Sequence, residues 1–446
     1  MKRYFSILLI ALILIPTCLT LASCDSEETT TLYVYNWGEY ISDGSEGTLD
    51  TNKAFEEYYY EKTGKKVTVN YSTFSSNESM YAKIESGSAA YDVIIPSDYM
   101  IERMVKEDML EPLDLEKIPN YKYIDEKFKG DNVYYEGDSD NTYSIPYFYG
   151  MIGVIYNTSI VSEEDAALES WSLMWNENYT REILQFNNSR DAFGTALYWL
   201  GYDVNEATEE QWREARDLLI KQKTLVQGYV MDEIFNKMSS GSAAIAAYYA
   251  GDFMSMYEDN EDLAFYYPKE GTNSYIDAMC IPKGSKNYDL AHEYINFMCE
   301  EEIAVANAEY TYYASPLTTV VNNEDYIETM SEVHPDALEI LYGEKASSVP
   351  SQAYLNLSPE KLVLLNNLWE ELKVENTIGN GIYICCGVIL AVIIILTVVQ
   401  TVKKRKRAKY YVLYIDREPP QESEHTKNVI TNVNAKNIPP SNPNKK

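Results

Sequence analysis

The residues best suited to chemistry stand together at positions 37–40, where Trp37, Glu39 and Tyr40 follow a predicted strand over 32–35. An indole or phenol ring attracts a cation through its negative face, and a carboxylate adds direct charge attraction. Side chains at the carboxyl end of a strand in an α/β protein commonly face a ligand crevice. The cluster therefore indicates a site for an organic cation. The alternative is a capped strand with ordinary core aromatics.

Strands and helices alternate through residues 31–373, and these elements must position the cluster. Strands are predicted over 32–35, 67–69, 92–95, 151–156 and 279–281, and helices over 53–63, 190–201, 209–222, 290–299 and 359–374. Alternation of this kind predicts an α/β fold with mostly parallel sheets.

The pattern passes from one set of strands to another near 143–147, 268–275 and 315–316. Several crossings predict two discontinuous lobes with a cleft between them. Lobe 1 is expected to comprise 31–144 and 275–314, and lobe 2 to comprise 145–274 and 315–374. Hinge closure over a ligand follows from that layout.

The N-terminus reads as a secretory signal over 1–23, with Lys2 and Arg3 before an apolar run. Leu21-Ala22-Ser23-Cys24 resembles a bacterial lipobox, which implies cleavage before Cys24 and a lipid on its sulfur. A polar linker over 24–30 follows. The alternative is an ordinary signal peptide in which the cysteine occurs by chance.

A second apolar run, over 381–402, predicts a transmembrane helix, and five basic residues follow it directly at 403–407. The positive-inside rule then places 403–446 in the cytoplasm as a basic, disordered tail, and the body on the extracytoplasmic side of the cell membrane. A buried core helix is the alternative.

The composition excludes several classes of function. The net charge is −32 although 403–446 is basic, so the body is strongly acidic and would repel nucleic acid. We find no catalytic triad, phosphate-binding loop or metal-ligand spacing, and therefore expect neither an enzyme nor a cofactor. Cys280 and Cys299 either form one disulfide or remain buried thiols.

Six motifs in this order resemble the polyamine-binding proteins (spermidine and putrescine) of bacterial ABC importers, over nearly all of 31–373. They are Leu32-Tyr33-Val34-Tyr35-Asn36-Trp37-Gly38-Glu39-Tyr40, Ser76-Asn77-Glu78-Ser79-Met80-Tyr81-Ala82-Lys83, Tyr91-Asp92-Val93-Ile94-Ile95-Pro96-Ser97-Asp98-Tyr99, Tyr143-Ser144-Ile145-Pro146-Tyr147, Ser189-Arg190-Asp191-Ala192 and Tyr267-Pro268-Lys269-Glu270-Gly271.

The resemblance implies a two-lobed type II periplasmic-binding-protein fold, with a polyamine held between the lobes and delivered to a permease. It also implies which residues bind the ligand: Trp37, Glu39, Tyr40, Ser97, Tyr99, Asn188, Asp191, Tyr249, Tyr275, Asp277 and Tyr313. For three of these a structural role is the alternative: a helix cap for Ser97, a first-turn helix charge for Asp191, and core packing for Tyr313.

The chain departs from the family pattern at several positions. Gly38 stands where a Thr can occur, and Asn188 stands where the best-known member has a second ligand carboxylate, so we expect fewer anions in the pocket. Tyr249 and Tyr275 replace Trp, which predicts a wider aromatic box. A family Gln has no secure counterpart; Gln352 or Asn356 could serve. The preferred polyamine is left open.

Two other functions compete with polyamine delivery. The pairs Tyr248-Tyr249 and Tyr312-Tyr313 could bind ferric ion as phenolates, although Trp37 and Glu39 do not suit a hard metal. A membrane-tethered polyamine sensor is the other alternative, although no signalling domain follows the apolar run.

Overall fold

The computed structural model describes residues 29–130, 141–374 and 380–415. The chain divides into two compact units, the first ending at Lys373 and the second beginning at Val374. The predicted signal peptide and Cys24 lie outside the described residues. The first unit contains all of the strands that the structure describes and the cavity discussed below.

One mixed sheet runs through the first unit in the order β2-β1-β3-β9-β4-β7-β5-β6, with β10 beside β9 and β8 beside β4. The strands are β1 (Thr30–Trp37), β2 (Val67–Phe74), β3 (Val93–Ile94), β4 (Ser144–Asn157), β5 (Ile183–Phe186), β6 (Val226–Val230), β7 (Ile245–Tyr249), β8 (Leu263–Tyr266), β9 (Thr272–Cys280) and β10 (Ser351–Ala353).

The long strands β4 and β9 join the two halves of this sheet. They pair antiparallel from Ser144 opposite Cys280 to Met151 opposite Ser274, with a register shift near Pro146. Parallel pairs lie in both halves, for example β1 with β2 and β5 with β6. The prediction of mostly parallel sheets therefore holds away from the centre, whereas β4 and β9 make the middle antiparallel.

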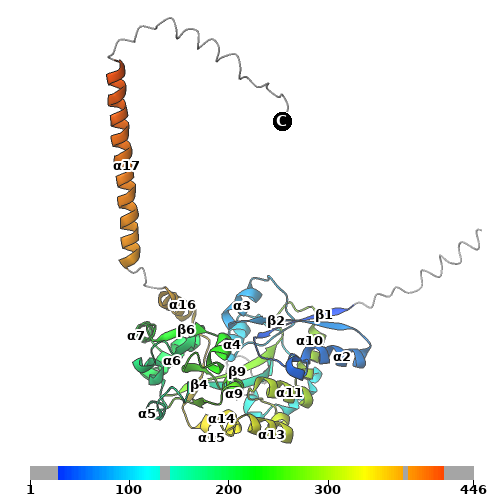
Figure 1. The fold of residues 1–446 in the computed structure, drawn as a ribbon. Coiled ribbons are helices and arrows are strands. Elements are labelled where there is room, and N and C mark those ends of the chain that lie inside the picture. The colour runs from blue at the N-terminus through cyan, green and yellow to red at the C-terminus, as the bar shows by residue number, and fades with distance from the viewer. Residues whose placement is uncertain (1–28, 131–140, 375–379, 416–446) are drawn as a thin grey trace, which may run out of the picture. The chain divides into compact units, whose positions relative to one another are not determined.

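Helices pack on both halves of the sheet, and helices that are distant in sequence lie side by side (Figure 1). The longer helices of the first unit are α2 (Thr51–Thr63), α3 (Asn77–Glu85), α4 (Asp98–Lys106), α6 (Ser189–Leu200), α7 (Glu209–Gln222), α8 (Glu233–Ser239), α9 (Ala250–Asp259), α10 (Tyr288–Met298), α11 (Glu301–Thr311), α13 (Glu324–Val333) and α16 (Pro359–Lys373); the short ones are α5 (Glu163–Ala166), α12 (Thr318–Val321), α14 (Ala337–Leu341) and α15 (Glu344–Ser347). For example, α10 packs against α2 through an edge-on contact between Tyr294 and Phe55.

Local sequence explains the bounds of α6 and the start of α7. Asn188 caps α6 by accepting a hydrogen bond from the Arg190 backbone N–H, and Gly201 ends that helix with a left-handed φ of 73°. Thr208 and Gln211 form a capping box at the start of α7. The helices predicted over 190–201 and 209–222 are therefore confirmed within about one or two residues.

Two predictions for the C-terminal part differ from the structure. No helix among the described residues is both long and apolar enough to cross a membrane, so a span over 381–402 is not supported. This segment lies within α17 (Asn380–Ile415). The tail predicted as disordered from 403 is helical to Ile415, since Lys, Arg and Ala favour helix.

The resemblance predicted a two-lobed α/β fold, and the architecture of the first unit confirms it. The boundaries given for the lobes stay a prediction. Cys280 and Cys299 are buried free thiols, so the disulfide alternative is not formed.

Candidate ligand-binding site

A single cavity with an empty volume of about 770 Å³ brings together all eleven predicted binding residues. Its lining comes from both halves of the sheet and from the central strand β9: Trp37, Glu39, Tyr40, Ser97, Tyr99, Asn188, Asp191, Tyr249, Tyr275, Asp277 and Tyr313.

The segment after β1 supplies one wall of the cavity. Trp37 packs against Phe74 with ring centroids 4.5 Å apart. Glu39 has a left-handed backbone with φ of 49°, a conformation that costs energy in a residue other than glycine and that is enriched at functional sites. Tyr40 is buried, and its hydroxyl donates to Asp277 at 2.7 Å.

Asp277 lies on β9 and is held by two hydroxyl groups. Its carboxylate accepts hydrogen bonds from Tyr40 and from the Ser97 hydroxyl at 2.6 Å. Burial raises its pKa to about 6, although both hydrogen bonds act in the opposite direction. Ser97 stands at the cap position of α4 but makes no side-chain cap bond, so its hydroxyl serves Asp277 and not the helix.

Asp191 forms a matching arrangement in the other half of the sheet. It is buried in the first turn of α6 and accepts a hydrogen bond from the Tyr249 hydroxyl at 2.8 Å. Burial raises its pKa to about 7. Asn188 is also buried at the cavity wall, but its side-chain oxygen caps α6, so it combines a structural role with its predicted position.

Sequence reasoning missed a further buried carboxylate, Asp252, in the first turn of α9. The Tyr313 hydroxyl donates to it at 2.7 Å, and burial raises its pKa to about 8. Gly251 makes this pair possible, because a Cβ at that position would lie 2.8 Å from the Tyr313 ring. The signal was present in the sequence, since Asp252 follows Tyr249 by three residues at a strand end.

Other lining residues also escaped prediction, among them Asp98, Arg190, Asp232 and Tyr354. Asp98 and Arg190 belong to the motifs quoted above, so the sequence carried a signal for them. Asp232 and Tyr354 belong to none. The lining thus contains acidic residues beyond the predicted ones, namely Asp98, Asp232 and Asp252. The expectation of fewer anions than in the best-known member stays a prediction.

Tyr354 occupies the region where a family Gln was sought. It is buried, and the guanidinium of Arg190 lies 4.4 Å from its ring centroid. Gln352 instead donates to Asp203 at 2.9 Å, and neither Gln352 nor Asn356 lines the cavity. Arg190 is the only Lys or Arg among the described residues of the lining.

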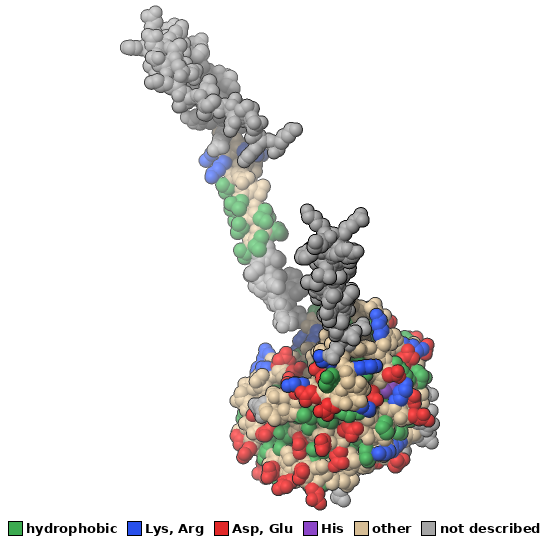
Figure 2. Space-filling view, turned by 90° about the vertical axis from the view of Figure 1, so that its right-hand side faces the viewer, with side chains coloured by type: hydrophobic (Ala, Val, Ile, Leu, Met, Phe, Trp, Pro, Cys, Tyr) green, Lys and Arg blue, Asp and Glu red, His purple; other side chains and the backbone are tan. Residues whose placement is uncertain are grey.

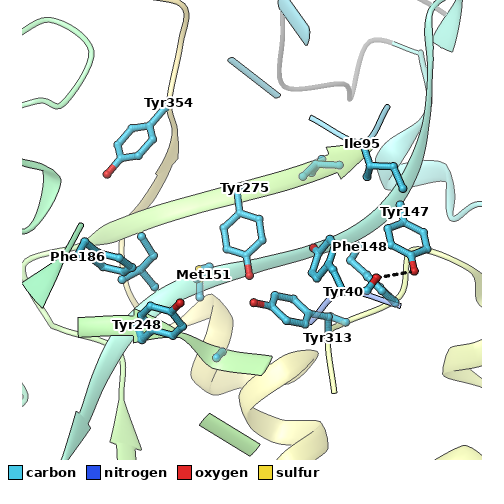
Figure 3. Packing of buried hydrophobic residues seen from close by; sticks show 14 of the residues in the cluster. Tyr40, Ile95, Tyr147, Phe148, Met151, Phe186, Tyr248, Tyr275, Tyr313 and Tyr354 are labelled. Carbon is cyan, nitrogen blue, oxygen red and sulfur yellow. Dashed lines mark hydrogen bonds between the residues drawn. The ribbon is translucent and has the colours of Figure 1, made fainter. Parts of the chain in front are cut away.

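Aromatic rings separate the carboxylates. Figure 3 shows Tyr275 projecting from β9 between Tyr248 and Tyr313, with Tyr40 and Phe148 beyond. Tyr249 meets Tyr275 edge-on at 5.3 Å, and Tyr313 meets Tyr40 edge-on at 4.7 Å. Rings in this arrangement present faces and edges to methylene groups and to cations.

The tyrosine pairs considered for ferric ion do not converge on one point. Tyr249 donates to Asp191 and Tyr313 to Asp252, whereas the Tyr312 hydroxyl donates to Glu258, which is exposed. Burial also raises the pKa values of Tyr249 and Tyr313 well above the ordinary value, which disfavours phenolate. The geometry of these tyrosines therefore does not support a ferric-ion site.

The fold and this cavity define an extracytoplasmic receptor for a small solute. The sequence pattern of the bacterial extracellular solute-binding proteins matches residues 53–332, and the chain belongs to that family.

Two relatives have names that state the ligands they bind. The spermidine/putrescine-binding periplasmic protein of Salmonella typhimurium is 29% identical over 339 residues, covering 74% of this chain and 90% of that protein. Spermidine/putrescine-binding periplasmic protein 1 of Haemophilus influenzae is 31% identical over 285 residues, covering 64% and 74%.

Solved structures give the same picture. A putative spermidine/putrescine ABC transporter protein from Listeria monocytogenes is 35% identical with a TM-score of 0.67, covering 77% of this chain and 99% of that chain. The spermidine/putrescine substrate-binding protein PotD of Streptococcus pneumoniae is 33% identical with a TM-score of 0.60, covering 77% and 98%.

Proposed function

We propose that this protein is a polyamine receptor that delivers its ligand to the permease of an ABC importer. The observation that carries the proposal is the alternation of buried carboxylates with aromatic rings in one cavity. A polyamine is a string of ammonium groups joined by methylenes, so its charges match Asp191, Asp252 and Asp277 and its methylenes match the tyrosine rings between them.

The energetics of the empty cavity favour a cationic ligand. Burial raises the pKa of Asp191, Asp252 and Asp277, which means that the ionised form of each lacks sufficient counter-charge. An ammonium group supplies that charge and converts an unfavourable buried anion into a buried pair with hydrogen bonds. Binding therefore releases the protons that these groups hold in the ligand-free protein.

The charge of the body assists capture of the ligand. The chain carries a net charge of −32, and Figure 2 shows Asp and Glu side chains spread over the viewed face of the body. An acidic surface attracts multivalent cations over a range set by ionic strength. The relatives named above, whose names include spermidine and putrescine, support the same ligand class and an importer as the partner.

Titration calorimetry of the purified chain tests this function. Putrescine, spermidine and spermine should each bind, and the uncharged isostere 1,4-butanediol should not, because it keeps the methylenes and loses the ammonium groups. A ligand that binds only the native state raises stability by roughly 2.7 kcal/mol at a hundredfold excess over Kd. No heat and no thermal shift with any of the three amines would contradict the proposal.

We infer further that Cys24 carries a lipid that keeps the receptor at the outer face of the membrane. The lipobox-like Leu21-Ala22-Ser23-Cys24 supports this, together with the extracellular setting of the family. Mass spectrometry of the N-terminal peptide should find a diacylglycerol adduct. Cys24→Ala should abolish the adduct; an unmodified mature N-terminus in the wild type would contradict it.

A further inference from the structure

Two acidic residues stand at the entrance of the cavity, and we call Glu39 and Asp232 the mouth carboxylates. Glu39 follows β1 in one half of the sheet, and Asp232 lies between β6 and α8 in the other. Both are exposed, whereas Asp191, Asp252 and Asp277 are buried. Partial burial raises the pKa of Glu39, and the charge of Asp232 raises it further, so the two like charges lie close together.

The absence of a side chain at Gly38 allows Asp232 to occupy this position. A Cβ on Gly38 would lie 2.9 Å from the Asp232 Oδ2 atom, which is closer than real Cβ atoms approach. Gly38 is also the position where the family pattern can have a Thr. A residue with a side chain there would have to displace the Asp232 carboxylate.

Other side chains at the same cavity also indicate an absent ligand. The hydroxyl of Tyr275, a residue that is 8% exposed, has no hydrogen-bond partner among the described residues. The Trp37 indole N–H is likewise buried and unpaired. Apolar side chains of Trp37, Met231 and Phe235 line the region around the mouth carboxylates. Buried polar groups without partners are rare, so they indicate where ligand or water binds.

We propose that Asp232, placed over Gly38 and opposite Glu39, forms a third ammonium subsite that makes this receptor favour triamines and tetraamines over diamines. This proposal rests on the polyamine function proposed above. It adds a specificity-determining residue for which the sequence showed no motif.

The order in which the ligand neutralises the carboxylates explains why the receptor would distinguish triamines from diamines. An uncompensated charge costs most where it is buried. Asp191 already has the charge of Arg190 nearby, which acts against the rise of its pKa, so the first two ammonium groups pair with Asp252 and Asp277. A diamine has no further charge to offer. A third ammonium, carried by another methylene arm, reaches the mouth, where it relieves the repulsion between Glu39 and Asp232.

Substitution of Asp232 tests this subsite independently of the buried carboxylates. Asp232→Asn should weaken spermidine and spermine binding by about two- to fivefold, which corresponds to about 0.4–1 kcal/mol and is the upper part of the range for exposed charge pairs. It should change putrescine affinity by less than about 1.5-fold. The loss should shrink at high salt because exposed charges are screened. Asp262→Asn is the matched control, because Asp262 is exposed, precedes β8 in the same half of the sheet, and does not line the cavity.

A second variant tests the steric part of the argument. Gly38→Ala adds one methyl group against the Asp232 carboxylate and should lower the spermidine-to-putrescine affinity ratio as Asp232→Asn does. In the double variant the two effects should not add, because both remove the same interaction. Thermal unfolding of each ligand-free variant shows whether the fold is kept.

The outcomes distinguish the two proposals. If the wild type binds none of the amines, the polyamine function itself is wrong. If the wild type binds them, and Asp232→Asn changes all three affinities equally or leaves them unchanged, the function stands and the mouth subsite is wrong. A lowered spermidine-to-putrescine ratio in both variants, with none in Asp262→Asn, supports the subsite.

Discussion

Asp277→Asn should raise the unfolding free energy of the ligand-free protein and lower its affinity for polyamines. Asp277 is 5% exposed, and its pKa is raised from 3.8 to about 6 by burial. A shift of about two pKa units corresponds to about 3 kcal/mol of penalty for the ionised form well above pH 6. The amide removes that penalty but loses one acceptor for the hydroxyls of Ser97 and Tyr40, which costs about 1 kcal/mol. We expect a net stabilisation of about 1–2 kcal/mol near pH 8.

The same substitution should weaken the free energy of ligand binding by more than it raises the unfolding free energy. Removing one partner of a buried charge pair typically costs about 2–5 kcal/mol, which corresponds to roughly a 30- to 4,000-fold loss of affinity. Urea unfolding without ligand measures the first effect, and titration with putrescine and spermidine measures the second. Asp262→Asn again serves as the control, since it removes an exposed carboxylate outside the cavity.

The effect of Asp277→Asn on the unfolding free energy should depend on pH, and this dependence can be measured. A carboxylate whose native pKa is raised contributes stability that is present at low pH and lost as pH rises through the native pKa. Near pH 4 Asp277 is already protonated in the native state, so Asp277→Asn should no longer stabilise. A variant that is less stable than the wild type near pH 8 and binds polyamines with unchanged affinity would show that Asp277 is not an uncompensated site carboxylate.

Three further predictions concern the same cavity. Because burial raises the pKa values of Asp191, Asp252 and Asp277, the unfolding free energy of the ligand-free protein should fall between about pH 5 and 8, while polyamine affinity should rise. Calorimetry in buffers of different ionisation enthalpy should detect the released protons. An unfolding free energy that rises, or an affinity that falls, over this pH range would contradict the prediction. Asn188→Asp keeps the cap of α6 and adds a charge, so spermidine affinity should rise relative to putrescine; an unchanged ratio would show that residue 188 acts as a cap alone. Tyr313→Phe removes the donor to Asp252 and should weaken binding by roughly tenfold or more, since a hydrogen bond to a charged group contributes about 1.5–3 kcal/mol. Tyr312→Phe, whose hydroxyl faces the exposed Glu258, should not weaken binding, and equal losses in the two variants would refute the assignment.

Short-range sequence determined most of the elements and most of the site. Capping residues and glycines at helix ends give α6 and α7 their bounds, and these signals are local. Eight of the eleven predicted residues end or follow strands or open helices, whereas Tyr275 and Asp277 lie within β9 and Tyr313 follows α11. Such positions gather at one cavity because the carboxyl ends of neighbouring strands meet at one edge of a sheet.

The tertiary structure alone decided which charges share the cavity and how they are balanced. Asp232 and Tyr354 come from segments without a motif, and only the path of β4 and β9 through the sheet brings them to the cavity containing Trp37. The raised pKa values of the buried aspartates likewise depend on burial, which no local pattern reports. The sequence could therefore indicate an organic cation as ligand, whereas the number and depth of the carboxylates that select it required the packing of distant segments.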